Sequence, residues 1–168
     1  KSNIGVNLNI AESPYCVIDF DINKSLPIEE IDRIAQQLID TFEFKNGIVR
    51  TANGGLHIYC KADKLPKYLM KQSRWCKNVL PGFEGKVDVD VFVPHVMSDE
   101  EVTRGMVNQS YVVYPGSQVY SKVYQRLNSY SKIDSSLNKC NWSFFNIEDF
   151  SVVYSRISEI IGQELVNS

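Results

Sequence analysis

The sequence has little of what marks the simplest functional classes. None of its segments reaches the ~20 consecutive apolar residues that a membrane-spanning helix needs, and no charged-then-apolar leader opens the chain. Proteins that coat nucleic acid by bulk attraction carry a marked basic excess, whereas the formal net charge here is -2. We therefore expect a soluble, intracellular protein without a membrane partner, in which any binding of nucleic acid depends on local patches of charge.

Cysteine and histidine are also too sparse for a structural zinc site. Such sites usually draw four Cys or His ligands from closely spaced pairs. This sequence has no C-x-x-C pair, and only His57 and His95 are available to join the cysteines. The four cysteines are far apart in the chain, at Cys16, Cys60, Cys76 and Cys140. We expect reduced thiols and no bound zinc.

The length bounds the number of domains. The chain has 168 residues, 43% of them hydrophobic, which is enough for one domain with a substantial core and too few for two comfortable ones. The first residue is Lys1 rather than Met, and a strand-like segment follows almost at once. We interpret residues 1–168 as a single domain excised from a longer protein.

Apolar periodicity and turn residues predict a mixture of strands and helices. Strands are expected over residues 4–8, 15–21, 47–51, 56–61, 86–93 and 111–114. Helices are expected from Pro27 through Leu38, over 65–80, over 98–106, and from a cap at Asn146 through Ile161. The polar stretch 129–136 is predicted to be a mobile loop.

Two of the predicted strands carry aspartates at alternate positions. In a strand, Asp19 and Asp21 share one face while the apolar residues between them point to the other. Asp88 and Asp90 repeat this pattern in a second strand. If the two acidic edges meet, three or four carboxylates lie together, and such a group can hold two divalent cations roughly 4 Å apart. Solvated aspartates on a polar sheet face are the alternative, but both strands look buried, where unpaired charge is costly.

The most specific stretch is the glycine pair Gly54-Gly55 with His57 shortly after it. Adjacent glycines permit the backbone of a tight turn to approach a ligand, and the histidine can contact a phosphate. Taken singly, a glycine pair is usually a turn and a lone histidine is usually a structural residue. The combination is what favours a binding site.

These motifs, in this order and spacing, resemble the catalytic domain of primase-polymerases in the archaeo-eukaryotic primase superfamily, notably those of archaeal plasmids, viruses and mobile elements. The similarity runs through Asn3-Ile4-Gly5-Val6, Val17-Ile18-Asp19-Phe20-Asp21, Gly54-Gly55-Leu56-His57-Ile58-Tyr59, Val87-Asp88-Val89 and Tyr111-Val112-Val113-Tyr114-Pro115-Gly116-Ser117. The resemblance implies an α/β fold of the α+β type, with a mainly antiparallel catalytic sheet flanked by helices. The acidic strands should approach His57 in an active-site cleft.

The resemblance also implies the role of each motif residue. The catalytic, cation-binding residues are Asp19, Asp21 and Asp88, with Asp90 as the reserve ligand, for two Mg²⁺ or Mn²⁺ ions. The nucleotide-binding residues are His57, Gly54, Gly55 and Ser117. The family's second motif often has a serine two residues before the histidine, where this chain has Gly55, so only backbone donation is available there. The longer connection between Val93 and Tyr111 also departs from the family pattern.

The implied activity is that of a DNA primase or DNA polymerase, a nucleotidyltransferase of DNA replication. Its partners are nucleoside triphosphates and a single-stranded DNA template with its primer. A viral origin would place it in the host nucleus or cytoplasm, and the resemblance also allows a helicase module in the same parent chain. A basic segment is available for template phosphates, through Lys64, Lys67, Lys71 and Arg74. An ordinary solvated helix face explains these four residues equally well.

Three other functions are weighed against this one. A nucleotide-sugar glycosyltransferase also uses Asp-x-Asp with a metal, but it leaves the second acidic strand and Gly-Gly-x-His unexplained. A rolling-circle nickase needs paired histidines on a strand, and His57 is alone. A non-catalytic descendant of the fold, which binds single-stranded nucleic acid or recruits replication proteins, is the main alternative.

Overall fold

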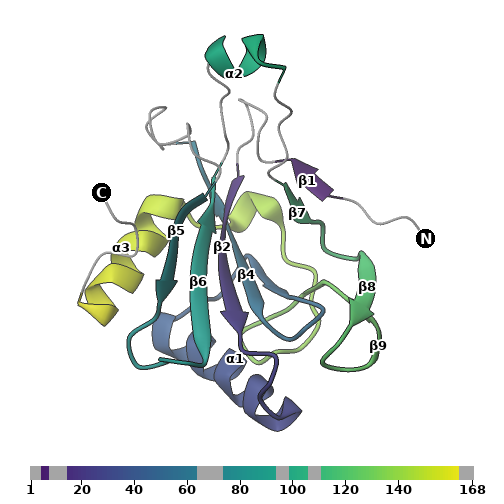
Figure 1. Ribbon diagram of the computed structural model, residues 1–168. Coiled ribbons are helices and arrows are strands. Elements are labelled where there is room, and N and C mark those ends of the chain that lie inside the picture. Colours follow the sequence, from purple (N-terminus) through teal and green to yellow (C-terminus); the bar gives the residue numbers. More distant parts are fainter. Residues whose placement is uncertain (1–4, 8–14, 64–73, 94–98, 106–110, 163–168) are drawn as a thin grey trace.

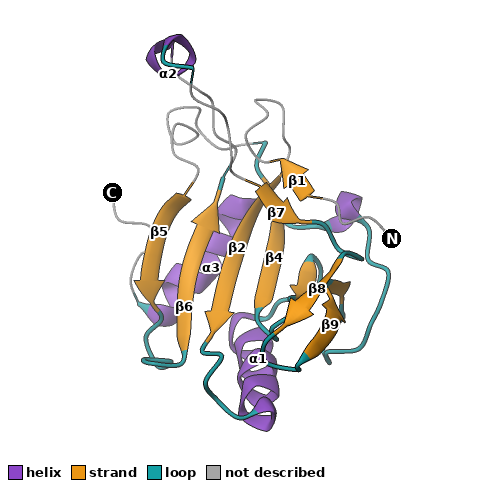
Figure 2. Ribbon diagram, turned by 45° about the vertical axis from the view of Figure 1, so that its right-hand side comes forward, coloured by secondary structure: helices purple, strands orange, loops and turns teal. Residues whose placement is uncertain are grey.

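The computed structural model describes residues 5–7, 15–63, 74–93, 99–105 and 111–162. Its centre is a six-stranded sheet in which every neighbouring pair is antiparallel. Across the sheet the strands are β10 (Ser131–Lys132), β3 (Ile48–Arg50), β4 (Leu56–Lys61), β2 (Tyr15–Ile22), β6 (Val87–Phe92) and β5 (Arg74–Val79). The chain is therefore a mixed α/β protein with an antiparallel sheet, as the sequence predicts (Figure 2).

Two helices cover one face of this sheet. They are α1 (Ile28–Phe42) and α3 (Phe150–Ile161), and both lie behind the strands in Figures 1 and 2. Helix α1 begins directly after Pro27, whose ring suits a helix start, and carries Glu29 and Glu30 in the first turn, where the helix dipole favours negative charge. The helix is buried against the strands through Ile31, Ile34, Ala35, Leu38, Ile39 and Phe42, whereas Ile28 at its start is 40% exposed.

The strand β2 shows how the core fixes the orientation of the acidic residues. Ile18, Phe20 and Ile22 are at most 1% exposed and point into the layer of helices. The Phe20 ring stacks on Phe42 of α1, with 6.0 Å between the ring centroids. Because side chains alternate along a strand, Asp19 and Asp21 must point to the opposite face.

An aromatic cluster covers part of that opposite face. Val17, Val49 and Tyr59 of the sheet pack there against Trp142 and Ile147 from the segment that precedes α3. The indole nitrogen of Trp142 donates to the carbonyl oxygen of Ile48 at 2.8 Å. This cover lies over β3, β4 and one end of β2, and leaves the acidic positions of β2 and β6 outside it.

Smaller elements complete the described structure. Strand β1 (Gly5–Asn7) pairs with β7 (Tyr111–Val113), and β8 (Gln118–Ser121) pairs with β9 (Arg126–Ser129) in a hairpin beyond the β4 side of the sheet (Figures 1 and 2). A short helix, α2 (Asp99–Thr103), and a 3-10 helix, η2 (Phe144–Asn146), are the remaining helical segments. The strands β8 and β9 are absent from the sequence-based prediction.

Three local predictions are wrong. Residues 74–79, expected in a helix, form the strand β5, because pairing with β6 satisfies the backbone in extended form. Within the expected loop 129–136, Ser131 and Lys132 pair with β3. The last helix starts three residues later than expected: Asp149 is its cap and accepts from the amide of Ser151 at 3.1 Å, whereas Asn146 ends η2. The rest of the expected helix over 65–80 lies mostly outside the described residues.

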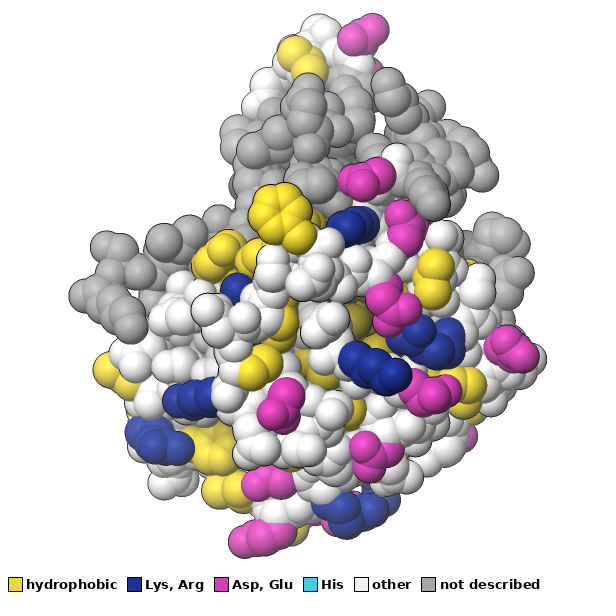
Figure 3. Space-filling model, turned by 180° about the vertical axis from the view of Figure 1, so that it is seen from behind, with side chains coloured by type: hydrophobic (Ala, Val, Ile, Leu, Met, Phe, Trp, Pro, Cys, Tyr) yellow, Lys and Arg dark blue, Asp and Glu magenta, His cyan; other side chains and the backbone are white. Residues whose placement is uncertain are grey.

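The outer surface of the two helices has no charge pattern suited to a nucleic acid. In Figure 3, which looks at the molecule from that side, cationic and anionic side chains of the described residues are interspersed. No helix in the described part of the chain is long and apolar enough to cross a membrane.

Candidate functional site

The strand register gathers the acidic residues predicted from the sequence. Asp19 on β2 lies directly between His57 on β4 and Asp90 on β6, and Asp21 lies opposite Asp88. Residues opposite one another in neighbouring strands share a face, with about 5 Å between their Cβ atoms. Four carboxylates and one imidazole therefore lie on the same face, opposite the helices.

The pKa of Asp21 reflects the negative charge gathered on this face. The pKa of Asp21 is raised, first by partial burial and then by the negative charge of Asp19. Asp88 and Asp90 raise it further, while the ammonium group of Lys24 acts in the opposite direction. Negative charge on this face is thus only partly compensated by the described residues.

Oxygen ligands of this kind suit Mg²⁺ or Mn²⁺. Within the described ranges, no group of three or more His, Cys, Asp or Glu side chains is already drawn together for a metal ion. Mutual repulsion of carboxylates favours such a separation when no cation is bound, and side-chain rotation from adjacent strands can close it. The donor set and the raised pKa of Asp21 fit a divalent cation.

His57 is held at the edge of this acidic face. It is 8% exposed, and its Nε2 lies 3.4 Å from Oδ1 of Asp19. Its Nδ1 is buried and has no hydrogen-bond partner among the described residues. A buried polar nitrogen without a partner costs stability, and such groups are rare in folded proteins outside positions with a special role.

Tyr130 is a site residue that the sequence does not single out. Its ring centroid is 5.8 Å from that of His57. The pKa of Tyr130 is raised by burial and, to a lesser extent, by the negative charges of Asp19 and Asp21. Nothing around it in the sequence marks it, since its position results from the pairing of the following strand, β10, with β3.

Ser117, predicted to contact a nucleotide, is positioned through Tyr130. The Tyr130 amide donates to the Ser117 carbonyl oxygen at 2.9 Å, and the Gly116 amide donates to the Tyr130 carbonyl oxygen at 2.6 Å. Ser117 itself is 5% exposed. It therefore lies beside a residue of the acidic face, and its contact with a nucleotide stays a prediction.

The two glycines before β4 are required by close packing. Gly54 has φ +90°, and a Cβ there would lie 2.7 Å from Cγ2 of Ile31. A Cβ on Gly55 would lie 2.6 Å from the carbonyl oxygen of Phe20, in the neighbouring strand β2. Only glycine lets the turn pass this close to the sheet. This turn therefore determines where β4 begins, and with it the position of His57.

Arg50 ties this turn to the first helix. Its Nε donates to the Gly54 carbonyl oxygen at 2.7 Å, and its Nη2 lies 2.8 Å from Oδ1 of Asp32 on α1. The hydroxyl of Tyr124 lies 3.4 Å from the same oxygen. The guanidinium group, only 17% exposed in its side chain, is a structural anchor beneath the site.

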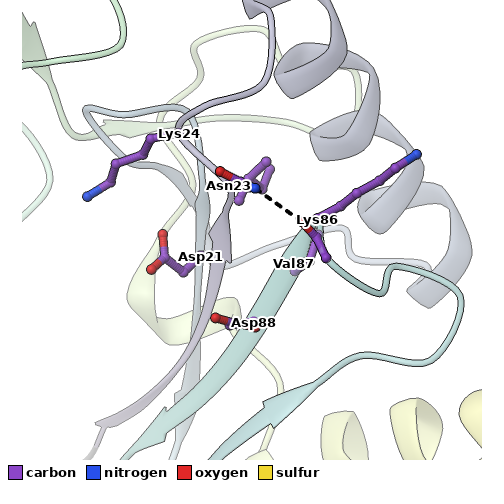
Figure 4. Close-up of a pocket in the computed structure, with 8 residues that line it drawn as sticks. Asp21, Asn23, Lys24, Lys86, Val87 and Asp88 are labelled. Carbon is purple, nitrogen blue, oxygen red and sulfur yellow. Dashed lines mark hydrogen bonds between the residues drawn. The ribbon is translucent and has the colours of Figure 1, made fainter.

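A cavity of about 390 Å³ opens beside Asp21 and Asp88, at the end of β2 and the start of β6 (Figure 4). Asn23 and Gly85 both line this cavity, and Asn23 donates from Nδ2 to the carbonyl oxygen of Gly85 at 3.1 Å. Lys24 lies on the same side as the Asp21 carboxylate, whereas Lys86 extends away and its Nζ lies 3.5 Å from Oε1 of Glu30. Lys24 is a second residue that sequence reasoning did not single out.

The predicted nucleic-acid segment is not brought to this site by the described residues. Lys64, Lys67 and Lys71 lie outside them, and Arg74 begins β5, where its backbone pairs with Phe92. Their role stays a prediction.

The raised pKa of Asp21 predicts a pH effect on stability. A carboxyl group whose pKa is higher in the folded state binds its proton more tightly there. Its contribution to stability is therefore full below the ordinary pKa of 3.8 and is lost as pH rises through the higher folded pKa. Without divalent cations, the parent should lose stability relative to Asp21→Asn as the pH rises above 3.8. Urea unfolding midpoints of both proteins across that range measure this, and parallel curves would contradict it.

Comparison of the chain with protein-family models, with curated proteins and with solved structures gave no significant match.

Proposed function

We propose that the domain catalyses template-directed nucleotidyl transfer with divalent cations, as a primase-polymerase. The observation that carries the proposal is the register of β2, β4 and β6. It puts Asp19, Asp21, Asp88 and Asp90 on one face, with His57 directly beside Asp19. The antiparallel sheet with helices on its other face agrees with the architecture expected from the resemblance.

In the proposed reaction, Asp19, Asp21 and Asp88 hold two Mg²⁺ or Mn²⁺ ions, and Asp90 is the reserve ligand. When bound, such ions lower the pKa of a primer 3'-hydroxyl and neutralise charge on the phosphate that it attacks. The carboxylates orient these ions from two adjacent strands, whose pairing fixes their separation. The products are a primer longer by one nucleotide and pyrophosphate.

The nucleotide would lie against His57 and the turn before it. His57, whose ring reaches the acidic face through Nε2 beside Asp19, would contact a phosphate oxygen. Gly55 has only backbone groups to offer the nucleotide, and Ser117 is hydrogen-bonded through its backbone to Tyr130, which borders His57. The proposed partners are nucleoside triphosphates and a primed single-stranded DNA template, in an intracellular setting.

Primer extension tests the proposal. The domain is incubated with a primed single-stranded template, nucleoside triphosphates and Mn²⁺ or Mg²⁺, and products are resolved by length. We expect template-dependent extension that stops when the cations are chelated. If no extension occurs with either cation while the domain still binds single-stranded DNA, the proposal fails and a non-catalytic nucleic-acid-binding module replaces it.

The non-catalytic module is the second candidate, and binding of single-stranded DNA without primer extension is the result that distinguishes it from the first. Sugar-nucleotide hydrolysis, the assay for a glycosyltransferase, is expected to be absent.

A further inference from the structure

One stretch of the chain stands out by its charge. From Val102 to Ile133 the sequence has no acidic residue, although the whole chain has 20. The same stretch contains four cations, Arg104, Lys122, Arg126 and Lys132. From Tyr111 onward the stretch forms β7, β8, β9 and β10, on the side of the molecule away from β5 (Figure 2), and contributes Lys122, Arg126 and Lys132 there. Arg104 directly follows α2 and is not part of this group.

The hairpin β8–β9 in this stretch exposes an apolar pair. Tyr120 and Leu127 lie directly opposite each other and are 61% and 64% exposed. The exposed cations Lys122 and Arg126 lie close to them at the end of the hairpin. Large exposed apolar side chains next to cations are typical of a surface that stacks bases and attracts phosphates.

The other side of the hairpin accounts for its attachment. Ser121 is fully buried and donates from its hydroxyl to Oδ1 of Asn53 at 2.8 Å. Asn128 donates from Nδ2 to the carbonyl oxygen of Ala52 at 2.9 Å. The hairpin is therefore docked on the turn before β4 by residues other than Tyr120 and Leu127, and the packing of the fold does not explain that exposed pair.

A groove continues from the hairpin toward the acidic face. It has a volume of about 360 Å³, and its lining includes Ser129 at the end of β9, Tyr114, Tyr130 and Lys139. No acidic residue lines it within the described part of the chain. Tyr130 belongs both to this groove and to the site, since its ring borders His57. Hairpin, groove and acidic face are thus continuous.

We propose that the β8–β9 hairpin and this groove bind a single strand of nucleic acid, with bases stacked on Tyr120 and phosphates beside Lys122, Arg126 and Lys139. The proposal rests on the proposed function for the meaning of the acidic face, and it names the surface along which that site's strand lies. Charge complementarity supports this proposal. Along the groove the phosphates would lie beside cations, and they would approach the aspartates only where the groove ends at the acidic face.

The test measures binding of a fluorescent single-stranded oligothymidine by anisotropy, with EDTA present and at several salt concentrations. Lys122→Gln/Arg126→Gln should raise the Kd about tenfold and flatten the slope of log K against log salt by about 1.4, since each phosphate contact on a single strand contributes about 0.7. Tyr120→Ala should raise the Kd about 5- to 150-fold through lost stacking, with little change in the salt slope.

Matched controls separate the surface from general charge and from folding. Arg33→Gln/Lys45→Gln removes the same charge from exposed residues of α1 and its following loop, and should change the Kd less than twofold. Thermal unfolding of each variant confirms that the hairpin substitutions, all at exposed positions, leave the fold intact. Equal weakening by the hairpin and control pairs, or by neither, overturns the proposal.

The outcomes also separate this proposal from the proposed function. If the parent extends primers but the hairpin variants bind like the parent, only the binding surface is wrong. If binding depends on the hairpin but no extension occurs with either cation, only the catalytic proposal is wrong. If both hold, the hairpin variants should extend primers with a raised KM for the primed template and a kcat close to that of the parent.

Discussion

Replacing Asp19 and Asp21 together by asparagine is expected to lower the rate of primer extension at least about 1,000-fold, because both the cation ligands and their charge are lost while the side-chain shape is kept. The two side chains lie on one face of β2, opposite Asp90 and Asp88 of β6. Single-nucleotide incorporation under excess template measures the loss. A double variant that keeps activity within tenfold of the parent would contradict the assignment.

Although it should abolish most activity, the same double substitution should not lower the stability of the metal-free protein. Asp21 has a raised pKa because it is partly buried and close to Asp19, so two neutral amides remove a repulsion. The metal-free melting temperature of the variant should equal or exceed that of the parent. Mn²⁺ at 100 times its Kd should stabilise only the parent, by about 2.7 kcal/mol, or about 5–10 °C. Loss of activity caused by misfolding would instead lower the variant's melting temperature.

A matched pair of substitutions controls for the change in charge. Asp40→Asn/Asp63→Asn also removes two carboxylates, both exposed and away from the acidic face. This variant should keep primer extension and the Mn²⁺-dependent rise in melting temperature. A comparable loss in the control would show that net charge, rather than the position of the ligands, controls activity.

Gly55→Ala is expected to lower the free energy of unfolding by about 2–4 kcal/mol, because the new methyl group has no room. Its Cβ would lie 2.6 Å from the carbonyl oxygen of Phe20 and 3.2 Å from Oγ1 of Thr51. The first of these is backbone of a central strand, which cannot move aside without disturbing β2. Urea unfolding monitored by circular dichroism measures the effect.

Gly82→Ala distinguishes a steric clash from the general cost of replacing glycine. Gly82 has φ +88°, but a Cβ there meets nothing within 4 Å. This variant should lose only about 1 kcal/mol, from the strained backbone angle. If the two variants lose equal stability, the close approach at Gly55 is not what requires glycine there.

Much of the fold follows from local sequence patterns. The alternation of apolar and acidic residues in 15–21 and 86–93 predicts strands with one buried and one polar face, and β2 and β6 have this form. The apolar stripe that begins at Ile28 predicts α1, which packs through Ile31, Ile34, Ala35 and Leu38 of that stripe. These predictions succeed because burial of one face is encoded within a few neighbouring residues.

The errors concern segments whose structure depends on distant partners. Residues 74–79 have lysine and arginine at spacings compatible with a helix, but β6 supplies an open strand edge that makes them β5. Likewise, Ser131 and Lys132 are polar enough for a loop and become β10 through β3. Tyr130, beside them, enters the acidic face for the same reason.

The sequence by itself determined that Asp19 and Asp21 share a face, that Asp88 and Asp90 share a face, and that the Gly54-Gly55 turn precedes a strand bearing His57. These relations extend over a few residues and follow from the geometry of a single strand or turn. Only the tertiary structure decided that the two acidic faces are the same one, with Asp19 between His57 and Asp90. Register between strands is set by the packing of α1 and α3 against their common apolar side, which brings together residues far apart in the chain.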